Sequence, residues 1–168
     1  LMQKRKTLSP KQELDVVDIL SQCYRMLGDH KAALLHTKRL LKLSIEVRGK
    51  GSKLHANALS GLGQVERELK DYPSAKMRFN DGLAILVKLG EEKSREYGDM
   101  LMGLADVDRE QKRWAEALEG YIKAKAVMDD FKEDQNHAVI VNNMAVCYKN
   151  LNRWTEALAC YREGVELA

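Results

Sequence analysis

Alanine recurs along this chain at a nearly constant interval. Ala33, Ala75, Ala117 and Ala157 are separated by 42, 42 and 40 residues. An aromatic residue or His precedes each alanine by three positions, and an aromatic residue or Thr follows it by four. The preceding set is His30, Tyr72, Trp114 and Trp154, and the following set is Thr37, Phe79, Tyr121 and Tyr161. Because self-similarity at a period of roughly 20 to 50 residues indicates stacked supersecondary units, this interval predicts a repeat array.

The units of the array are predicted to be helical. Apolar residues follow helical spacing through most of the chain, and β-branched residues never alternate with polar ones over a strand's length. Ser9, Pro10 and Gln12 form a capping-box start, and Gly28, Gly90 or Asn152 end helical segments. We predict eight helices in four antiparallel pairs. The turns are expected near residues 28–30, 70–72, 112–114 and 152–154, and longer loops near 49–53, 90–94 and 131–136.

Small residues recur at two further repeat positions. Twelve residues before the alanines lie Ser21, Gly63, Ala105 and Ala145, which predicts close approach of the two helices in a pair. Seven residues after the alanines lie Leu40, Gly82, Ala124 and Gly164. We expect this second position to face the first helix of the next pair, because close packing would offset the ~1 kcal/mol cost of a glycine inside a helix.

Bulk composition excludes several classes of protein. The 168 residues include 28 basic and 25 acidic ones, well mixed, which predicts neither a nucleic-acid surface nor an acidic tail. Cys23, Cys147 and Cys160 form no close-spaced pair, so reduced thiols and a cytoplasmic location are expected. The first residues show no signal-peptide pattern, and no apolar run reaches the ~18 residues that a membrane span requires. The first and last residues read as those of an excised piece of a longer protein.

The repeated residues resemble the tetratricopeptide repeat, in which Leu-Gly, Tyr, Ala and an aromatic residue recur at set spacings. The Leu-Gly element is matched at residues 62–63, 104–105 and 144–145. Tyr24 and Tyr148 match the Tyr, whereas Glu66 and Asp108 depart from it and the closing Pro is absent. The interval exceeds the family's roughly 34 residues and resembles the lengthened repeats of kinesin light chain-type adaptors. Residues 139–148 are similar to the LNNLAxxY run of those adaptors.

The resemblance covers about residues 14–168 and implies an all-α fold. The expected architecture is a right-handed superhelical solenoid of four antiparallel helix pairs, with repeats of 40–42 residues. We predict a single array over residues 1–168, with repeats at about 14–55, 56–97, 98–137 and 138–168. Residues 1–13 would be a lead-in or the tail of an earlier repeat.

In this family the first helix of each pair lines a concave groove, so the resemblance implies a non-enzymatic scaffold or adaptor that binds a partner's peptide segment there. The candidate groove residues are Gln22, Arg25, Asn57, Gln64, Arg67, Met102, Asp106, Arg109, Asn142, Asn143, Val146 and Lys149. The same helix faces also carry Asp15, Asp18, Met26, Ser60, Glu68, Asp99, Glu110, Val139 and Asn150. The partner is expected to be a protein or peptide, and neither nucleic acid nor a membrane.

One groove position is basic in every unit: Arg25, Arg67, Arg109 and Lys149. Such a row would bind an acidic or carboxylate-bearing peptide through charge-assisted hydrogen bonds. The alternative is a structural role, in which acidic neighbours such as Glu68 and Glu110 neutralise the row within the protein. Asn142 and Asn143 likewise fit either a peptide backbone or a polar face without a ligand.

The two-carboxylate clamp of the chaperone-tail subfamily is missing. Asp18 and Gln22 stand where its first Lys and Asn would be, and Gly61 replaces the Asn of the second unit. Asp99 and Gly103 replace the Lys and Arg of the third unit. Binding of a Glu-Glu-Val-Asp-type tail is therefore not expected.

Signals of catalysis or metal binding are weak. His30, His36, His55 and His137 lack the i,i+4 spacing of helical metal ligands, and His30 is interpreted as a substitute for the turn aromatic. The cysteines are expected to be inert core residues. Residues 48–53 are basic and Gly-rich without P-loop spacing, which favours an inter-repeat loop over a phosphate site. We expect no enzymatic activity, cofactor or metal.

Self-assembly is the alternative function. No polar capping helix follows Leu167 and Ala168, and repeat arrays need capped ends. Further repeats or another copy of the chain would cover the exposed face.

Overall fold

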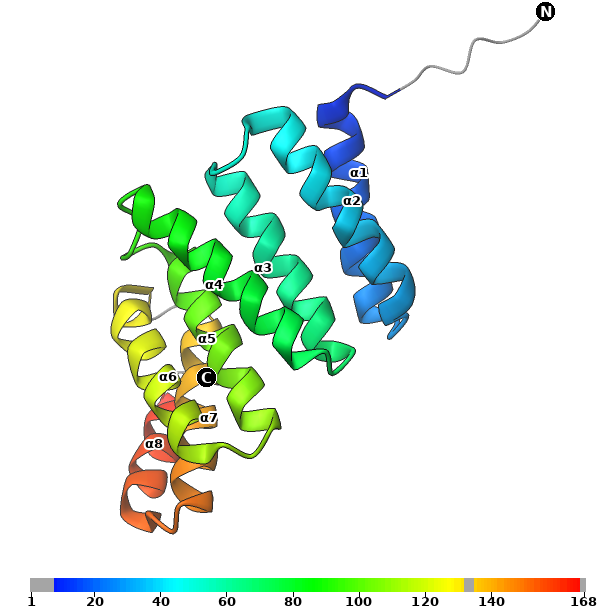
Figure 1. Ribbon diagram of the computed structural model, residues 1–168. Helices are drawn as coiled ribbons and strands as arrows, with labels where there is room; N and C mark the ends of the chain where they lie inside the picture. Colours follow the sequence, from blue (N-terminus) through cyan, green and yellow to red (C-terminus); the bar gives the residue numbers. More distant parts are fainter. Residues whose placement is uncertain (1–7, 132–134, 167–168) are drawn as a thin grey trace, which may run out of the picture.

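The computed structural model describes residues 8–131 and 135–166, which contain eight α-helices and no strand. The predicted all-α, right-handed solenoid of four antiparallel helix pairs is confirmed, and the pairs stack in chain order (Figure 1). The helices are α1 (Pro10–Met26), α2 (His30–Arg48), α3 (Lys53–Glu68), α4 (Tyr72–Lys88), α5 (Arg95–Glu110), α6 (Trp114–Met128), α7 (Gln135–Asn150) and α8 (Trp154–Glu166). A short 3-10 helix, η1 (Asp129–Phe131), follows α6.

The ends of the helices follow the repeat. Each second helix begins at the predicted turn aromatic or His, and Ser9 forms the expected capping box with Gln12. Gly28, Gly90 and Asn152 have the left-handed backbone expected of residues that end helices. α1 starts at Pro10, within the segment predicted as a lead-in. The predicted loop near 131–136 lies partly outside the described residues, and α7 begins inside that range.

A buried aromatic ring joins the second pair to the third. Phe79 of α4 is fully buried and lies between two glycines, Gly63 of α3 and Gly103 of α5. A Cβ atom at Gly63 would lie 3.2 Å from the ring, and one at Gly103 would lie 2.6 Å from it. Both helices therefore approach Phe79 closely because neither has a side chain at that point.

The predicted contact between pairs at the second small position is confirmed for Gly82. A Cβ atom on Gly82 would lie 2.7 Å from the sulfur of Met100, which belongs to the first helix of the next pair. Gly164 in α8 lies instead against Asn142 of its own pair. The same glycine position thus packs between pairs inside the array and within the pair at its end.

Alanine substitutions at two equivalent glycines are expected to have opposite effects. Gly103→Ala should destabilise the protein by about 1–3 kcal/mol, because the new methyl group overlaps the Phe79 ring. At Gly61, 42 residues earlier, the nearest atom to a new Cβ is the Thr37 methyl at 3.7 Å, an ordinary contact. Gly61→Ala should therefore stabilise the helix by up to about 1 kcal/mol. Urea unfolding measures both changes, and equal effects would contradict this account.

Candidate functional site

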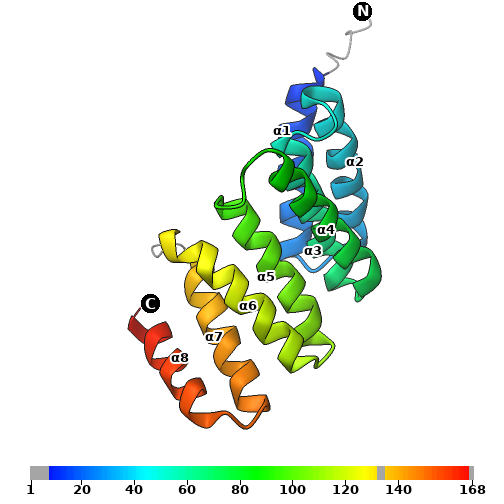
Figure 2. The ribbon, with the colours of Figure 1, turned by 60° about the vertical axis from the view of Figure 1, so that its left-hand side comes forward.

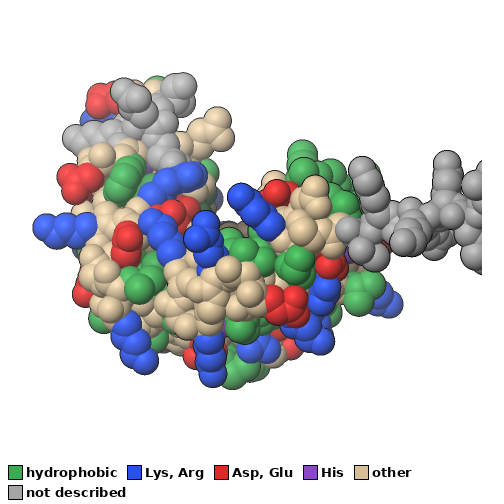
Figure 3. All heavy atoms as spheres, turned by 90° about the horizontal axis from the view of Figure 1, so that it is seen from above, with side chains coloured by type: hydrophobic (Ala, Val, Ile, Leu, Met, Phe, Trp, Pro, Cys, Tyr) green, Lys and Arg blue, Asp and Glu red, His purple; other side chains and the backbone are tan. Residues whose placement is uncertain are grey.

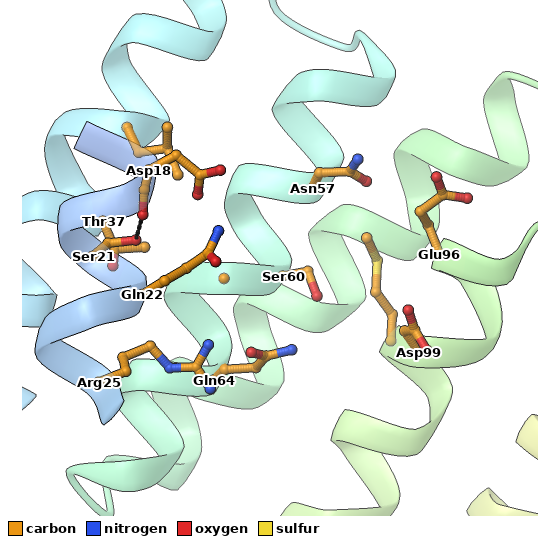
Figure 4. Close-up of a pocket in the computed structure, with 13 residues that line it drawn as sticks. Asp18, Ser21, Gln22, Arg25, Thr37, Asn57, Ser60, Gln64, Glu96 and Asp99 are labelled. Carbon is orange, nitrogen blue, oxygen red and sulfur yellow. Dashed lines mark hydrogen bonds between the residues drawn. The ribbon is translucent and has the colours of Figure 1, made fainter. Parts of the chain in front are cut away.

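A polar groove lies between the first helices of the first three pairs. It has a volume of about 290 Å³ and opens on α1, α3 and α5 (Figure 4). The whole molecule is hollowed between its two ends, with basic and acidic side chains gathered together beside the hollow (Figure 3). The polar groove is lined by Asp18, Ser21, Gln22, Arg25, Thr37, Leu40, Asn57, Ser60, Gly61, Gln64, Glu96, Asp99 and Met100.

Three amide side chains in the polar groove are available to a ligand. Gln22 of α1 and Asn57 and Gln64 of α3 are directed toward the space between the helices (Figure 4). Within residues 8–131 and 135–166, none of the three has a hydrogen-bond partner. Each amide offers both donors and an acceptor, which is the set that a peptide backbone requires. The sequence predicted all three as groove residues.

Two members of the basic row form ion pairs with the following unit. Arg25 Nη2 lies 2.9 Å from Glu68 Oε1, and Arg67 Nη1 contacts Glu110. Each pair joins residues 43 positions apart, so the same contact repeats at two successive junctions. All four side chains are partly buried. These arginines are therefore engaged inside the protein, as the structural interpretation of the row requires.

The last two members of the row, Arg109 and Lys149, do not pair with a glutamate of a following unit. Asn150 occupies the position in the fourth unit that Glu68 and Glu110 occupy in the second and third. Arg109 turns instead toward Tyr121, donating from Nε to the hydroxyl over 2.9 Å. Lys149 is exposed and has no ion-pair partner in the described part of the chain.

Asp106 is the centre of a buried polar network. Its carboxylate accepts hydrogen bonds from the Tyr121 hydroxyl and, over 3.3 Å, from Asn143 Nδ2. Arg109 lies 3.5 Å from one carboxylate oxygen, and Arg67 lies 3.6 Å from the other. Burial, together with the negative charge of Asp106, raises the pKa of Tyr121, so its hydroxyl keeps the proton that it donates. The network connects α3, α5, α6 and α7.

The predicted groove residues thus fall into separate groups. Four of them line the polar groove: Gln22, Arg25, Asn57 and Gln64. Arg67, Asp106, Arg109 and Asn143 form internal contacts. Met102 packs against the core of the last two pairs, Val146 is half-buried, and Asn142 and Lys149 are exposed.

Glu96 was missed among the lining residues. It precedes Asp99 by three positions and therefore shares its helix face, which was the signal available in the sequence. Thr37 and Leu40 come from a second helix, α2, which the groove prediction did not include.

At the two positions where this chain lacks the family's Tyr, an acidic residue forms an ion pair instead. In the first unit Tyr24 stacks on His36, with ring centroids 5.1 Å apart. Glu66, at the same repeat position, contacts Arg78 at 3.4 Å. Burial raises the pKa of the Glu66 carboxyl, and the charge of Arg78 opposes that rise. Asp108 contacts Lys76 Nζ at 2.7 Å.

The described residues offer no clear metal site and no activated cysteine. In the described residues, no three His, Cys, Asp or Glu side chains form a group that would hold a metal ion. Cys147 and Cys160 are buried as expected, and burial raises the pKa of the Cys147 thiol to about 11. The core prediction is wrong for Cys23, which is exposed because none of the described helices packs over that face of α1. The described helices include none long and apolar enough to span a membrane.

Two matches to the tetratricopeptide repeat family model cover residues 16–86 and 96–168. The chain belongs to the tetratricopeptide repeat family. Proteins built from these repeats are typically non-enzymatic interaction scaffolds, and a protein–protein interaction scaffold is the general role of this repeat protein. Among curated proteins, no relative matches the sequence.

Solved structures share this tetratricopeptide repeat fold at low sequence identity. BtubC (BKLC) from P. vanneervenii is 18% identical with a TM-score of 0.80, over 98% of this chain and 66% of that one. A putative kinesin light chain repeat protein from Podosopora anserina is 14% identical with a TM-score of 0.78, over 96% and 77%. The apo form of RapI is 15% identical with a TM-score of 0.82, over 97% and 58%. The chain therefore spans about two thirds of the first of these proteins.

Proposed function

We propose that this repeat array holds an extended segment of a partner protein in the polar groove. The observation that carries the proposal is that three amides, Gln22, Asn57 and Gln64, line the groove from α1 and α3 without a hydrogen-bond partner among the described residues. Amides of this kind hydrogen-bond the backbone of an extended chain, which gives affinity without demanding one sequence. The proposed role requires neither a cofactor nor a metal.

The charges around the groove support a partner segment that carries a basic side chain. Asp18 lines the groove and has no side-chain partner in the described parts of the chain. The basic residue in the groove, Arg25, is already paired with Glu68. An acidic segment would have to displace Glu68, although a partly exposed pair of this kind contributes only about 0.2–1 kcal/mol. A basic segment meets an open carboxylate and displaces nothing.

Peptide arrays of varied charge, followed by calorimetry on the peptides that bind, would test the proposal. We expect enrichment of Lys and Arg, and a three- to tenfold loss of affinity in Asn57→Ala, about the value of one lost hydrogen bond. Asp18→Lys should weaken binding of the basic peptides further.

The matched control is Asn80→Ala, since Asn80 is an exposed amide on α4 outside the groove. Affinity that is unchanged in both Asn57→Ala and Asp18→Lys would refute the groove assignment. If acidic peptides are enriched instead and bind the Arg25→Glu variant more weakly, the groove assignment stands and only the proposed basic character of the partner segment is refuted.

A further inference from the structure

One side of α2 exposes lysines and apolar residues in a single row. The row consists of Lys31, Leu35, Lys38, Lys42 and Ile45, all exposed, and is termed the α2 stripe. Its members follow helical spacing and therefore share one face of α2. Leu40, which lines the polar groove, follows Lys31 by about two and a half turns and so points to the opposite side of the helix. The α2 stripe thus faces away from the polar groove.

The three lysines of the α2 stripe are unpaired. Within residues 8–131 and 135–166, none of Lys31, Lys38 and Lys42 forms an ion pair. Arg39, on the neighbouring face of α2, is instead held by Glu13 at 2.7 Å. Leu35 lies between the first two lysines and is 68% exposed. An anionic partner would therefore meet free ammonium groups beside an apolar side chain.

The equivalent side of α4 is uncharged. The residues 42 positions later are Pro73, Met77, Asn80, Ala84 and Val87, all exposed, and are termed the α4 stripe. Met77 is 48% exposed and Val87 is 46% exposed. Asp81 and Lys88, the exposed charges beside the α4 stripe, offset each other. Apolar side chains gathered on one exposed face are typical of an interaction surface.

The exposure of both stripes is a property of each helix pair. α4 lies inside the array, with helix pairs on both sides of it (Figure 2). It packs on α3 and α5, and α2 packs in the same way on α1 and α3. Each stripe lies on the side of its helix that these two neighbours leave uncovered.

The two stripes border a common surface above α3. Glu66 of α3 is buried and contacts Arg78 of α4 at 3.4 Å. Burial raises the pKa of its carboxyl, whereas the charges of Arg78 and of Lys38 on α2 oppose that rise. Lys38 is therefore close enough to act on the residue that α4 contacts. The α2 stripe and the α4 stripe together are termed the outer surface.

The charge of the outer surface favours a narrow anionic partner over a broad one. On α6, the next second helix, the position of Leu35 and Met77 is taken by the exposed Glu119. An anionic lipid surface wide enough to reach α6 would be repelled there. A single helix that lies along α2 and α4 would avoid Glu119. Its carboxylates would recur at the helical spacing that the three lysines follow.

We propose that the outer surface binds an acidic amphipathic helix of a partner protein. The apolar face of the helix packs on the α4 stripe, and its carboxylates lie along the lysines of the α2 stripe. No ion pair within the described residues has to break for the lysines to bind. The site is separate from the polar groove and takes a segment of opposite charge, so the array holds the two segments independently.

Selection from a displayed library of helical peptides, with a fixed apolar face and edges of varied charge, would test the proposal. We expect Asp and Glu to be enriched along one edge. Calorimetry on the selected peptides should show about a tenfold loss of affinity in the double variant Lys38→Glu/Lys42→Glu, since two attractive pairs become repulsive. Higher salt should weaken binding of the same peptides to the unmodified chain.

Met77→Glu tests the apolar half of the outer surface. Glu119 stands naturally at this position of α6, so the variant should keep its helical circular dichroism. It should bind the selected peptides at least tenfold more weakly, because a charge replaces an apolar contact and repels the carboxylates of the peptide.

The matched control is Lys11→Glu/Lys112→Glu, which changes the net charge equally at two exposed lysines outside both stripes. It should bind the acidic helices as the unmodified chain does. Asp18→Lys, in the polar groove, should also leave their affinity unchanged. Failure of the groove proposal and failure of this one are therefore distinguishable.

Three results would overturn the proposal. A selection that enriches no acidic edge would remove the assigned partner. Selected peptides that bind Lys38→Glu/Lys42→Glu and Met77→Glu as tightly as the unmodified chain would lie elsewhere on the molecule. Anionic phosphatidylserine vesicles that bind the unmodified chain and not the double lysine variant, in the absence of peptide binding, would assign the outer surface to lipid.

Discussion

Asp106→Ala is expected to lower the free energy of unfolding by about 3 kcal/mol. The change removes the acceptor of the Tyr121 hydroxyl and of Asn143, and the carboxylate nearest to Arg109. Tyr121 is fully buried, so its hydroxyl would keep the hydrogen bond from Arg109 but lose the acceptor of its own proton, out of reach of water. Removing one partner of a buried charged pair costs about 3–5 kcal/mol, and the partial exposure of Arg109 places the expected loss at the lower end. Urea unfolding followed by circular dichroism measures it.

Asp15→Ala serves as the control for Asp106. Asp15 is exposed on α1 and has no recorded partner in the described residues, so its loss should remain within about 0.5 kcal/mol. Tyr121→Phe should cost about 1 kcal/mol, since it removes the donor and keeps the ring. A loss below 1 kcal/mol for Asp106→Ala would mean that the network contributes little to stability.

Phe79→Ala is expected to cost about 3–5 kcal/mol. The ring is fully buried between Gly63 and Gly103, and neither glycine has a side chain that would fill the space left behind. The cavity would lie at the junction of the second and third pairs. Because neighbouring pairs stabilise one another in a solenoid, unfolding of Phe79→Ala should also become less cooperative. Calorimetry reports both the lower transition temperature and the broader transition.

The same repeat position supplies the comparison for Phe79. Tyr161 lies at this position in α8 and is partly exposed, so Tyr161→Ala in dilute monomeric protein should cost less than about 1.5 kcal/mol. Similar losses for Phe79→Ala and Tyr161→Ala would show that burial at the junction does not determine the effect.

The recurring alanines determine most of the fold, because a fixed interval sets the register of every helix. His30, Tyr72, Trp114 and Trp154 all begin helices, as that register predicts. The pairing of Arg25 with Glu68 also follows the interval, since 43 residues is one repeat and one position. The sequence offered ligand binding and internal pairing as alternatives for this row. The contacts of Arg25 and Arg67 show internal pairing, and ligand binding by the row stays a prediction.

The burial of a side chain depends on which helix packs over it, and the repeat interval does not give that information. Cys23 and Cys147 occupy the same repeat position, yet one is exposed and the other is buried. The Asp106 network depends on side chains from four helices, and its members vary between units. Gln64 and Val146 stand at the position of Asp106 in the neighbouring units. Comparison of the repeats with one another therefore does not predict this network.

The ion pairs between units give the array a direction. Arg25–Glu68, Arg67–Glu110 and Lys76–Asp108 each join a cation in one unit to a carboxylate in the next. The series leaves an unpartnered cation, Lys149, in the last described unit, whereas Met26 takes the glutamate position in the first. Each arginine of the series is therefore neutralised only while the following unit is present. An array that ended after α2 would lack Glu68 and leave Arg25 unpaired beside the polar groove.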